Sequence, residues 1–288
     1  MKIPSIFKNG VVIKKGQKSG PTSIVITGCH GNELCGVLAL QKLLPTLTIE
    51  NGMVFFVLGN PEAIKKNKRF TEANLNRMFQ KSSAYSAKIK KTYEYKRAQH
   101  IKTIMRQADV CLDIHSTTNK STPFIIAEEN ATQTVQFFPK DFTKIVSGFG
   151  AIEPGATDDY MNARGKIGIG VECGQHVDPK AEKVAHKAII SFLKTRGHIQ
   201  TGKKQEKPPT RKHLHMYELY YSKTNSFNLM KKLDDFYEAQ KGEVIAHDGD
   251  KKVRMKNNCV VVFAHDRDKK GEEAFLLGSW VTRRKNLK

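Results

Sequence analysis

Ile24-Val25-Ile26-Thr27-Gly28-Cys29-His30-Gly31-Asn32-Glu33 is the stretch that decides the fold. It begins with an apolar run, typical of a buried strand, and ends with a histidine and a glutamate three residues apart. A second apolar run, Val110-Cys111-Leu112, precedes Asp113-Ile114-His115. Two histidines and a glutamate are ligand types of hydrolytic zinc sites, which keep a fourth position open for water. The pattern predicts one zinc ion held by His30, Glu33 and His115, if the two strand ends are neighbours in space.

The first two hundred residues alternate apolar runs with helical patterns. Strands are predicted at 24–27, 53–58, 109–114, 123–127 and 167–173. Helices are predicted at 34–44, 86–107 and 181–196. This alternation is typical of an α/β fold with a mostly parallel sheet covered by helices on both faces. Sites in such sheets form outside the carboxyl ends of the strands, which is where both motifs fall.

The composition changes after residue 200. Residues 201–209 are polar and end in two prolines, which is typical of a linker. Short branched or aromatic runs follow at 216–221, 244–246 and 260–264. We therefore expect a catalytic domain over 1–200, a linker over 201–209 and a smaller β-rich domain over 210–288.

The chain is strongly basic. It contains 49 lysines and arginines against 28 acidic residues, which gives a net charge of +21. Such a balance is compatible with nucleic acid, an anionic surface or an acidic small substrate. The lysines are scattered in pairs, which is typical of solvated faces, so a basic RNA- or anion-binding protein is the alternative interpretation. We find no apolar run long enough to cross a membrane and no signal core, and we expect a cytoplasmic protein with reduced cysteines.

Two further acidic residues fall at predicted strand ends. Glu172 follows Gly168-Ile169-Gly170-Val171, and a carboxylate in a buried strand is costly unless it is paired or near a metal. Its predicted role is general base, against the alternative of a structural salt bridge. Asp113 lies two residues before His115 on the same side of the strand, so it is suited to hold the second nitrogen of a metal-binding histidine. We expect that histidine to be His30, although Asp113 could instead cap a turn.

Arginines suited to an anionic substrate lie between the two motifs. Arg69 and Arg77 flank Asn76 on an irregular segment, and Arg164 stands shortly before the Glu172 strand. Arginine forks bind carboxylates in two-point fashion, so these residues favour a substrate that carries a carboxylate. The alternative is that each is simply exposed to solvent.

The chain resembles the succinylglutamate desuccinylase/aspartoacylase family of zinc carboxypeptidase-like enzymes, and within it the aspartoacylase branch most closely. Seven pieces match in family order across about residues 22–200. They are Gly28 to Glu33, Asn60-Pro61 with Ala63 and Lys65-Lys66, Arg69, Leu75-Asn76-Arg77, Arg97-Ala98-Gln99, Leu112 to Thr118, and Gly170 to Gly174.

The resemblance implies a fold and a set of roles. The fold would be a mixed central sheet with a C-terminal β domain over the cleft. His30, Glu33 and His115 would bind zinc, and Glu172 would be the catalytic base. Arg69 would polarise the scissile carbonyl. Asn76 and Arg77 would hold the substrate α-carboxylate, and Arg164 a side-chain carboxylate. The implied activity is cleavage of the amide bond of an N-acylated, acidic amino acid.

The chain also departs from the family pattern. Asn74 stands where an aspartate is usual, and no tyrosine occurs near Asp268 or Lys269, where aspartoacylases have one. His176, just past the Glu172 strand, is a candidate residue for the rim of the site, with a surface-loop histidine as the favoured alternative. These departures leave open the acyl group and the amine, with peptide-like substrates as a further alternative. They also leave open the oligomeric state, with a homo-oligomer as one expectation.

Overall fold

The computed structural model describes residues 6–7, 9–200 and 207–281. The strands are β1 Val11–Lys15, β2 Lys18–Thr27, β3 Asn51–Leu58, β4 Val110–Thr117, β5 Phe124–Ala127, β6 Lys144–Ser147, β7 Ile167–Gln175, β8 Lys212–Tyr221, β9 Phe227–Leu229, β10 Tyr237–Ala239, β11 Val244–Asp248, β12 Lys251–Arg254, β13 Cys259–Val262 and β14 Glu273–Trp280. The α-helices are α1 Cys35–Leu43, α2 Pro61–Lys66, α3 Ala87–Lys91, α4 Tyr93–Met105, α5 Thr132–Val135, α6 Phe149–Ile152, α7 Thr157–Asn162 and α8 Ala181–Thr195. Short 3₁₀ turns lie at Leu75–Arg77, Ser82–Ala84 and Glu129–Ala131.

A single mixed sheet forms the centre of the molecule. Its strand order is β1-β3-β2-β4-β7-β5-β6-β8-β14-β13-β10. The strands β3, β2, β4 and β7 are parallel, whereas β1 and β5 run antiparallel to their neighbours β3 and β7. The predicted α/β fold with a mixed central sheet is confirmed.

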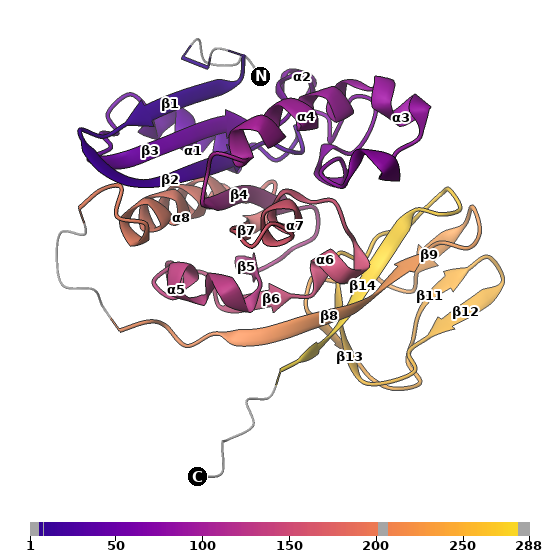
Figure 1. The fold of residues 1–288 in the computed structure, drawn as a ribbon. Coiled ribbons are helices and arrows are strands. Elements are labelled where there is room, and N and C mark those ends of the chain that lie inside the picture. Colours follow the sequence, from indigo (N-terminus) through magenta and orange to yellow (C-terminus); the bar gives the residue numbers. More distant parts are fainter. Residues whose placement is uncertain (1–5, 8, 201–206, 282–288) are drawn as a thin grey trace.

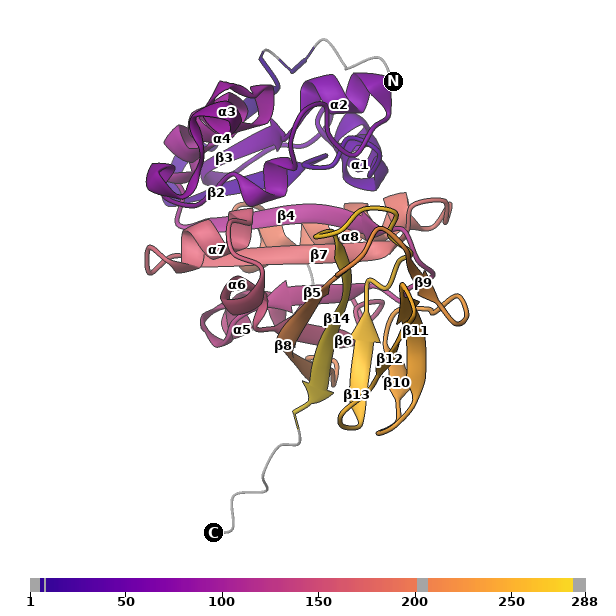
Figure 2. The same cartoon turned by 90° about the vertical axis from the view of Figure 1, so that its right-hand side faces the viewer.

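Helices cover both faces of the parallel strands (Figures 1 and 2). On one face α1 and α8 pack on the sheet through a core that includes Leu40, Leu112 and Phe192. On the other face α4 packs through a second core that includes Phe55 and Ile101. Burial on both faces explains why these strands read as continuous apolar runs instead of alternating patterns.

The C-terminal region continues the central sheet. Strand β8 pairs in parallel with β6, and β14, β13 and β10 follow it. A separate three-stranded sheet, β12-β11-β9, packs over this extension. The β-rich C-terminal region is thus present as predicted. Residues 201–206 of the predicted linker lie outside the described residues.

One predicted helix is divided. The pattern over 86–107 predicts a single helix, and this is wrong because the chain turns at Thr92, which has extended backbone angles (φ −65°, ψ 153°). The Thr92 hydroxyl accepts a hydrogen bond from the Tyr95 backbone N–H and so caps the start of α4. Helix α3 before it has no fully buried residue and reaches the core only through the partly buried Ile89, whereas α4 buries several side chains there.

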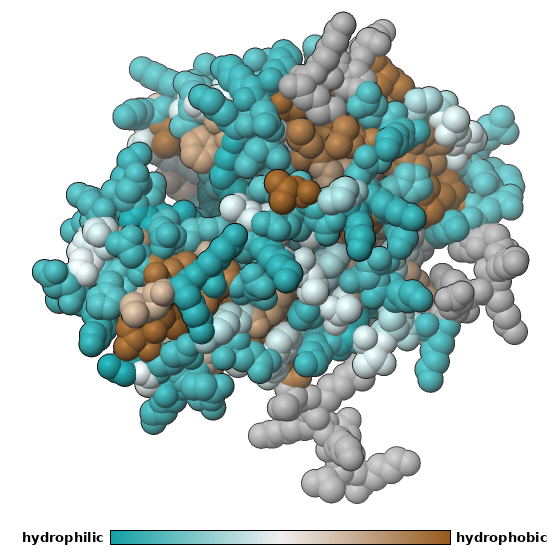
Figure 3. All heavy atoms as spheres, turned by 180° about the vertical axis from the view of Figure 1, so that it is seen from behind, coloured by the Kyte–Doolittle hydropathy of each residue, from teal (hydrophilic) through white to brown (hydrophobic). Residues whose placement is uncertain are grey.

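The face shown in Figure 3 is mostly hydrophilic, and its apolar residues fall in separate patches. Among the described residues, no helix combines the length and apolar character needed to cross a membrane.

Candidate active site

The two motifs meet at one edge of the parallel sheet. Strand β2 pairs with β4 so that Thr27 lies beside Ile114, and β4 pairs with β7 so that His115 lies beside Glu172. The side chains that follow these strand ends therefore converge. Gly31 is required here, because a Cβ at that position would lie 2.1 Å from the carbonyl carbon of Ala63.

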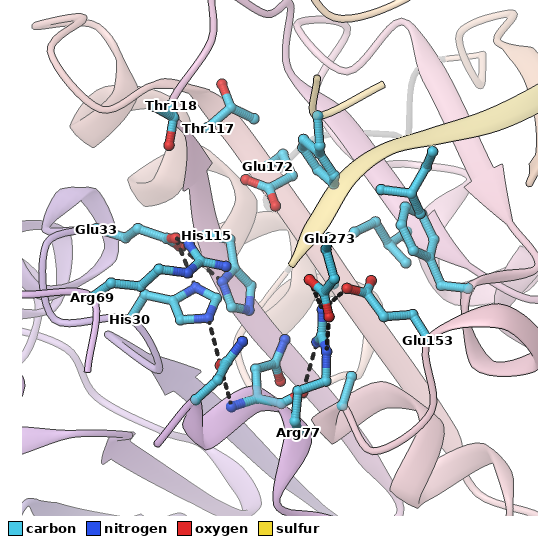
Figure 4. Close-up of a pocket in the computed structure, with 18 of the residues that line it drawn as sticks. His30, Glu33, Arg69, Arg77, His115, Thr117, Thr118, Glu153, Glu172 and Glu273 are labelled. Atoms are coloured by element: carbon cyan, nitrogen blue, oxygen red, sulfur yellow. Dashed lines mark hydrogen bonds and ion pairs between the residues drawn. The ribbon is translucent and has the colours of Figure 1, made fainter. Parts of the chain in front are cut away.

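Three side chains form a compact group with the geometry of a metal site (Figure 4). Nδ1 of His30 lies 2.7 Å from Oε1 of Glu33, and Nδ1 of His115 lies 2.9 Å from Oε2 of the same carboxylate. One ligand atom from each residue lies within 4.8 Å of the other two. All three side chains are buried, yet they line the same cavity. The two imidazole nitrogens and one carboxylate suit zinc.

The far nitrogens of both histidines are also held. Nε2 of His115 lies 3.1 Å from Oδ2 of Asp113, which also accepts a hydrogen bond from the Thr157 hydroxyl. Nε2 of His30 lies 3.0 Å from Oδ1 of Asn74. The partner of Asp113 thus differs from the expected His30, because Asp113 and His115 lie on the same side of β4 and Asn74 occupies the place next to His30.

A second set of possible ligands overlaps the first. Cys29, Asp113 and His115 also lie close enough to hold an ion. Cys29 does not line the cavity, and burial raises the pKa of its thiol well above the usual range, with Asp113 acting in the same direction. Metal ligation needs the thiolate, so the group of His30, Glu33 and His115 fits a metal better.

The charges of this group depend on one another. Burial opposes ionisation of Glu33, but the neighbouring His30 and His115 hold the pKa of its carboxyl well below the usual range. Burial lowers the pKa of His30 to about 4 despite the attraction of Glu33. Glu33 is therefore ionised and His30 neutral near pH 7, which are the forms that bind a metal. Burial opposes protonation of His115, but Asp113 and Glu33 raise the pKa of this ring well above the usual range, so metal binding would displace a proton from it.

Glu172 lines the same cavity, on β7 next to His115 of β4. Its side chain is 8% exposed, and Oε2 has no hydrogen-bond partner among the described residues. Burial raises the pKa of this carboxyl well above the usual range, Glu33 adds to the shift, and His115 opposes it. A buried, unpaired carboxylate that faces a cavity is the arrangement expected of a proton acceptor.

Arg69 and Asn76 line the cavity as expected. Nη1 of Arg69 donates to Oε1 of Glu33 at 3.2 Å, and its side chain is 44% exposed. Oδ1 of Asn76 accepts a hydrogen bond from the backbone N–H of Thr157 at 3.3 Å. The side-chain N–H groups of Asn76 do not take part in this bond.

Arg77 also lines the cavity, but it is already paired. Its Nε lies 3.3 Å from Oε1 of Glu273, its Nη2 donates to Oε2 of the same carboxylate at 3.3 Å, and Nη2 also contacts Glu153. Figure 4 shows the guanidinium between the two carboxylates.

Two other predicted residues lie differently. Arg164 does not line the cavity: its guanidinium carbon stacks 3.6 Å from the centre of the Tyr160 ring, and Nη1 donates to the Tyr160 carbonyl. The turn after α7 directs it away from the site. His176 hydrogen-bonds to the Ser116 and Thr118 hydroxyls on the β4 side of the site, and it does not line the cavity.

Sequence reasoning missed most of the cavity beyond the strand ends. The cavity has a volume of about 560 Å³ and is also lined by Glu153, Asp158, Asp159, Tyr221, His265, Arg267, Glu272 and Glu273. Several of these come from the C-terminal region, whose side chains reach the site only through the β6–β8 pairing. The sequence has no tyrosine near Asp268, but Tyr221 of β8 lines the cavity.

Comparison with known proteins defines the class of protein. The succinylglutamate desuccinylase/aspartoacylase catalytic domain matches residues 19–196, which is more than half of the chain. The chain therefore belongs to this family, as the sequence predicts.

Individual relatives are similar over part of their length. A probable aspartoacylase of Nostoc sp. is 27% identical over 52% of this chain and 54% of its own length. The aspartoacylase of Xenopus tropicalis is 31% identical over 40% of each chain. A rat N-acyl-aromatic-L-amino acid amidohydrolase (carboxylate-forming) is 28% identical over 59% of this chain and 57% of its own length. The alignments thus span little more than half of these relatives at most.

Solved structures share the fold over nearly the whole chain. The crystal structure of succinylglutamate desuccinylase from Vibrio cholerae has a TM-score of 0.78 at 18% identity, with 96% of this chain and 87% of that chain covered. The ectoine utilization protein EutE (DoeB) from Ruegeria pomeroyi has a TM-score of 0.69 at 23% identity, with 94% and 88% covered. At these identities the likeness establishes the fold alone.

Proposed function

We propose that this chain is a zinc-dependent amidohydrolase that cleaves the linear amide bond of an N-acylated amino acid, as named for its relatives. The observation that carries this proposal is the position of Glu172, whose buried and unpartnered Oε2 faces the cavity lined by His30, Glu33 and His115. The relatives named aspartoacylase, succinylglutamate desuccinylase and N-acyl amino acid amidohydrolase support the reaction class.

The residues present fit a zinc ion. Nδ1 of His30, Nδ1 of His115 and the carboxylate of Glu33 would hold it, and the contacts of Asn74 and Asp113 fix the far nitrogen of each imidazole. When bound, zinc would activate water and polarise the scissile carbonyl.

The protein groups supply the proton transfers and the positioning. Glu172 accepts a proton from the attacking water and then delivers it to the nitrogen of the leaving amine. Arg69, which is partly exposed in the cavity, donates hydrogen bonds to the oxygen that becomes negatively charged in the tetrahedral intermediate. Asn76 and Arg77 receive the α-carboxylate of the substrate, which requires Arg77 to share its donors with Glu153 and Glu273.

The division of the chain supports the same proposal. Residues 1–200 would carry the catalytic groups, and residues 210–288 would close the far side of the cavity. The cytoplasmic location and the oligomeric state stay predictions.

The test is amine release after zinc loading. The purified chain is loaded with zinc, its metal content is measured, and amine release is followed with N-acetyl derivatives of glutamate, norleucine and ornithine. We expect hydrolysis of at least one. In Glu172→Gln we expect zinc content to be kept and turnover to fall by about 10²–10⁴-fold. Near-normal turnover of this variant would refute the role of Glu172.

The same experiment addresses the RNA-binding alternative. Absence of hydrolysis by a fully zinc-loaded protein, together with RNA affinity that falls steeply with salt, would replace the proposed function with nucleic-acid binding.

A further inference from the structure

We infer that the amine portion of the substrate carries a free ammonium group, so that the preferred substrates are N-acyl diamino acids and not N-acyl derivatives of aspartate or glutamate. This inference rests on the proposed function and deepens it. It replaces the acidic amino acid that the family resemblance implies.

The cavity has the opposite charge from the rest of the chain. The whole sequence has 49 basic and 28 acidic residues. Within the described residues, eight acidic side chains and three arginines line the cavity, and no lysine does. The excess of positive charge is therefore confined to other surfaces. A negatively charged cavity with walls of low dielectric constant attracts cations and repels anions.

The arginine expected to bind a carboxylate is already neutralised. Arg77 pairs with both carboxylate oxygens of Glu273 and also with Glu153. The side chains of Arg77 and Glu153 are 21% and 10% exposed, so solvent screens this cluster only partly. Two carboxylates around one guanidinium leave a net negative charge. The α-carboxylate of a substrate can therefore bind Arg77 only by competing with Glu153 and Glu273.

Among the described residues, few arginines remain for a second substrate carboxylate, and Arg267 is the cavity arginine without a carboxylate partner in the ion pairs of this structure. Arg164 stacks on Tyr160 outside the cavity. Arg69 lies at the catalytic end, where it contacts Glu33. Arg267 donates through Nε to the backbone carbonyl of Glu273. A side-chain carboxylate on the substrate would therefore meet mainly negative groups.

Further carboxylates line the cavity. Asp158, Asp159 and Glu272 line the cavity together with Glu153 and Glu273. Glu172, whose Oε2 has no hydrogen-bond partner among the described residues, belongs to the same lining. A zinc ion would offset the charge of Glu33 and Glu172 and would leave the remaining carboxylates of the lining without a matching positive charge. An ammonium group placed among them gains ion pairs that a neutral or anionic side chain cannot form.

The size of the cavity is consistent with this substrate class. A volume of about 560 Å³ accommodates a small ligand such as an acylated amino acid. The N-acetyl derivatives of ornithine, norleucine and glutamate differ mainly in the end of the side chain, which is cationic, neutral or anionic. They therefore separate charge from length.

The test compares kcat/KM for these three compounds with the zinc-loaded chain. We expect the ornithine derivative to exceed the norleucine derivative, and the glutamate derivative to be slowest, with an overall preference of about tenfold or more. In Glu273→Gln we expect the ratio of ornithine to glutamate rates to fall by about tenfold. Glu62→Gln, which removes a surface carboxylate paired with Lys65, is the matched control and should leave the ratio unchanged.

The outcomes separate this inference from the proposed function. Hydrolysis of all three compounds with the glutamate derivative preferred, or a ratio that Glu273→Gln does not move, would overturn the inference and keep the amidohydrolase. No hydrolysis of any of them by a zinc-loaded protein would overturn both.

Discussion

The two walls of the cavity differ in burial and in how firmly their side chains are held. On the wall formed by the ends of β2, β4 and β7, His30, Glu33 and His115 are at most 5% exposed and hydrogen-bonded at both ring nitrogens or both carboxylate oxygens. On the wall formed by the C-terminal region, Glu273 is 37% exposed. The side chains of the first wall are therefore held in fixed positions, whereas the second wall exposes a negatively charged carboxylate to the cavity. On the proposed function, the first wall would serve the reaction, and the second would contribute to substrate selectivity together with Glu153.

Arg69→Ala should break the catalytic wall most severely. We propose that this arginine stabilises the developing oxyanion, and loss of such a donor typically costs about 10²–10³-fold in kcat. Steady-state kinetics with the best substrate measures the loss. Arg69→Lys should recover only part of it, because a lysine lacks the planar fork. A rate within about twofold of wild type would show that Arg69 has no part in the reaction.

Asn74→Ala should lower the affinity for zinc without changing the wall formed by the C-terminal region. Oδ1 of Asn74 is fixed by the backbone N–H of Asn76 and holds Nε2 of His30. Removal of such an outer contact typically lowers metal affinity by about 10–100-fold. Competition with a chromophoric chelator measures zinc affinity, and Asn74→Asp should retain it. Unchanged affinity in Asn74→Ala would mean that His30 is oriented by other contacts.

Asp235→Asn tests how a buried carboxyl between the β4–β5 connection and the C-terminal region affects the free energy of unfolding. Asp235 is 8% exposed, its Oδ1 accepts from the Phe263 backbone N–H, and burial raises the pKa of its carboxyl from 3.8 to about 6. The folded state therefore holds a proton that the unfolded state has lost, and this contribution to stability disappears as the pH rises from about 4 to about 6.

The expected gain follows from that sign. At about pH 7.5, Asp235→Asn should raise the free energy of unfolding by about 1–3 kcal/mol, and near pH 4 the gain should vanish. Urea unfolding at both pH values measures it. Asp234→Asn, at an exposed neighbouring position, is the control with no expected gain. An equal effect at both pH values would show that ionisation of Asp235 is not the cause.

Arg164→Ala should have the smallest effect and sharpens the contrast with Arg69. Its guanidinium stacks on Tyr160 outside the cavity, so kcat/KM should stay within about twofold of wild type. Stability should fall by about 0.5–1 kcal/mol through loss of the cation–π contact. A large rise in KM confined to acidic substrates would instead restore Arg164 as a substrate ligand.

The sequence predicted that His30, Glu33 and His115 would meet at one edge of the sheet, and it could do so because the signals are local. Each ligand follows a buried apolar run, and parallel strands place their carboxyl ends at one edge. The positions of His30, His115 and Glu172 on adjacent strands follow from that rule.

The C-terminal wall could not be predicted in the same way. Glu273 and Tyr221 reach the cavity because β8 pairs with β6 and β14 pairs with β8, and no local pattern specifies such long-range pairing. The spacing of Arg164 from Glu172 gave no information on the direction of its side chain. The break at Thr92 was missed because the apolar period continues across it.

The parallel pairing of β6 with β8 has a consequence for engineering. A fragment that ended near residue 200 would leave the backbone groups of Lys144–Ser147 without their neighbouring strand, and an uncovered edge of this kind recruits other chains and promotes aggregation. Exchange of the whole C-terminal region between family members therefore puts folding at risk. Transplanting only the short connection at 265–272 before β14 keeps the pairings of β14 with β8 and β13, provided that the new connection retains the backbone bridge of position 267 to Phe227, and it offers a safer route to new substrate preferences.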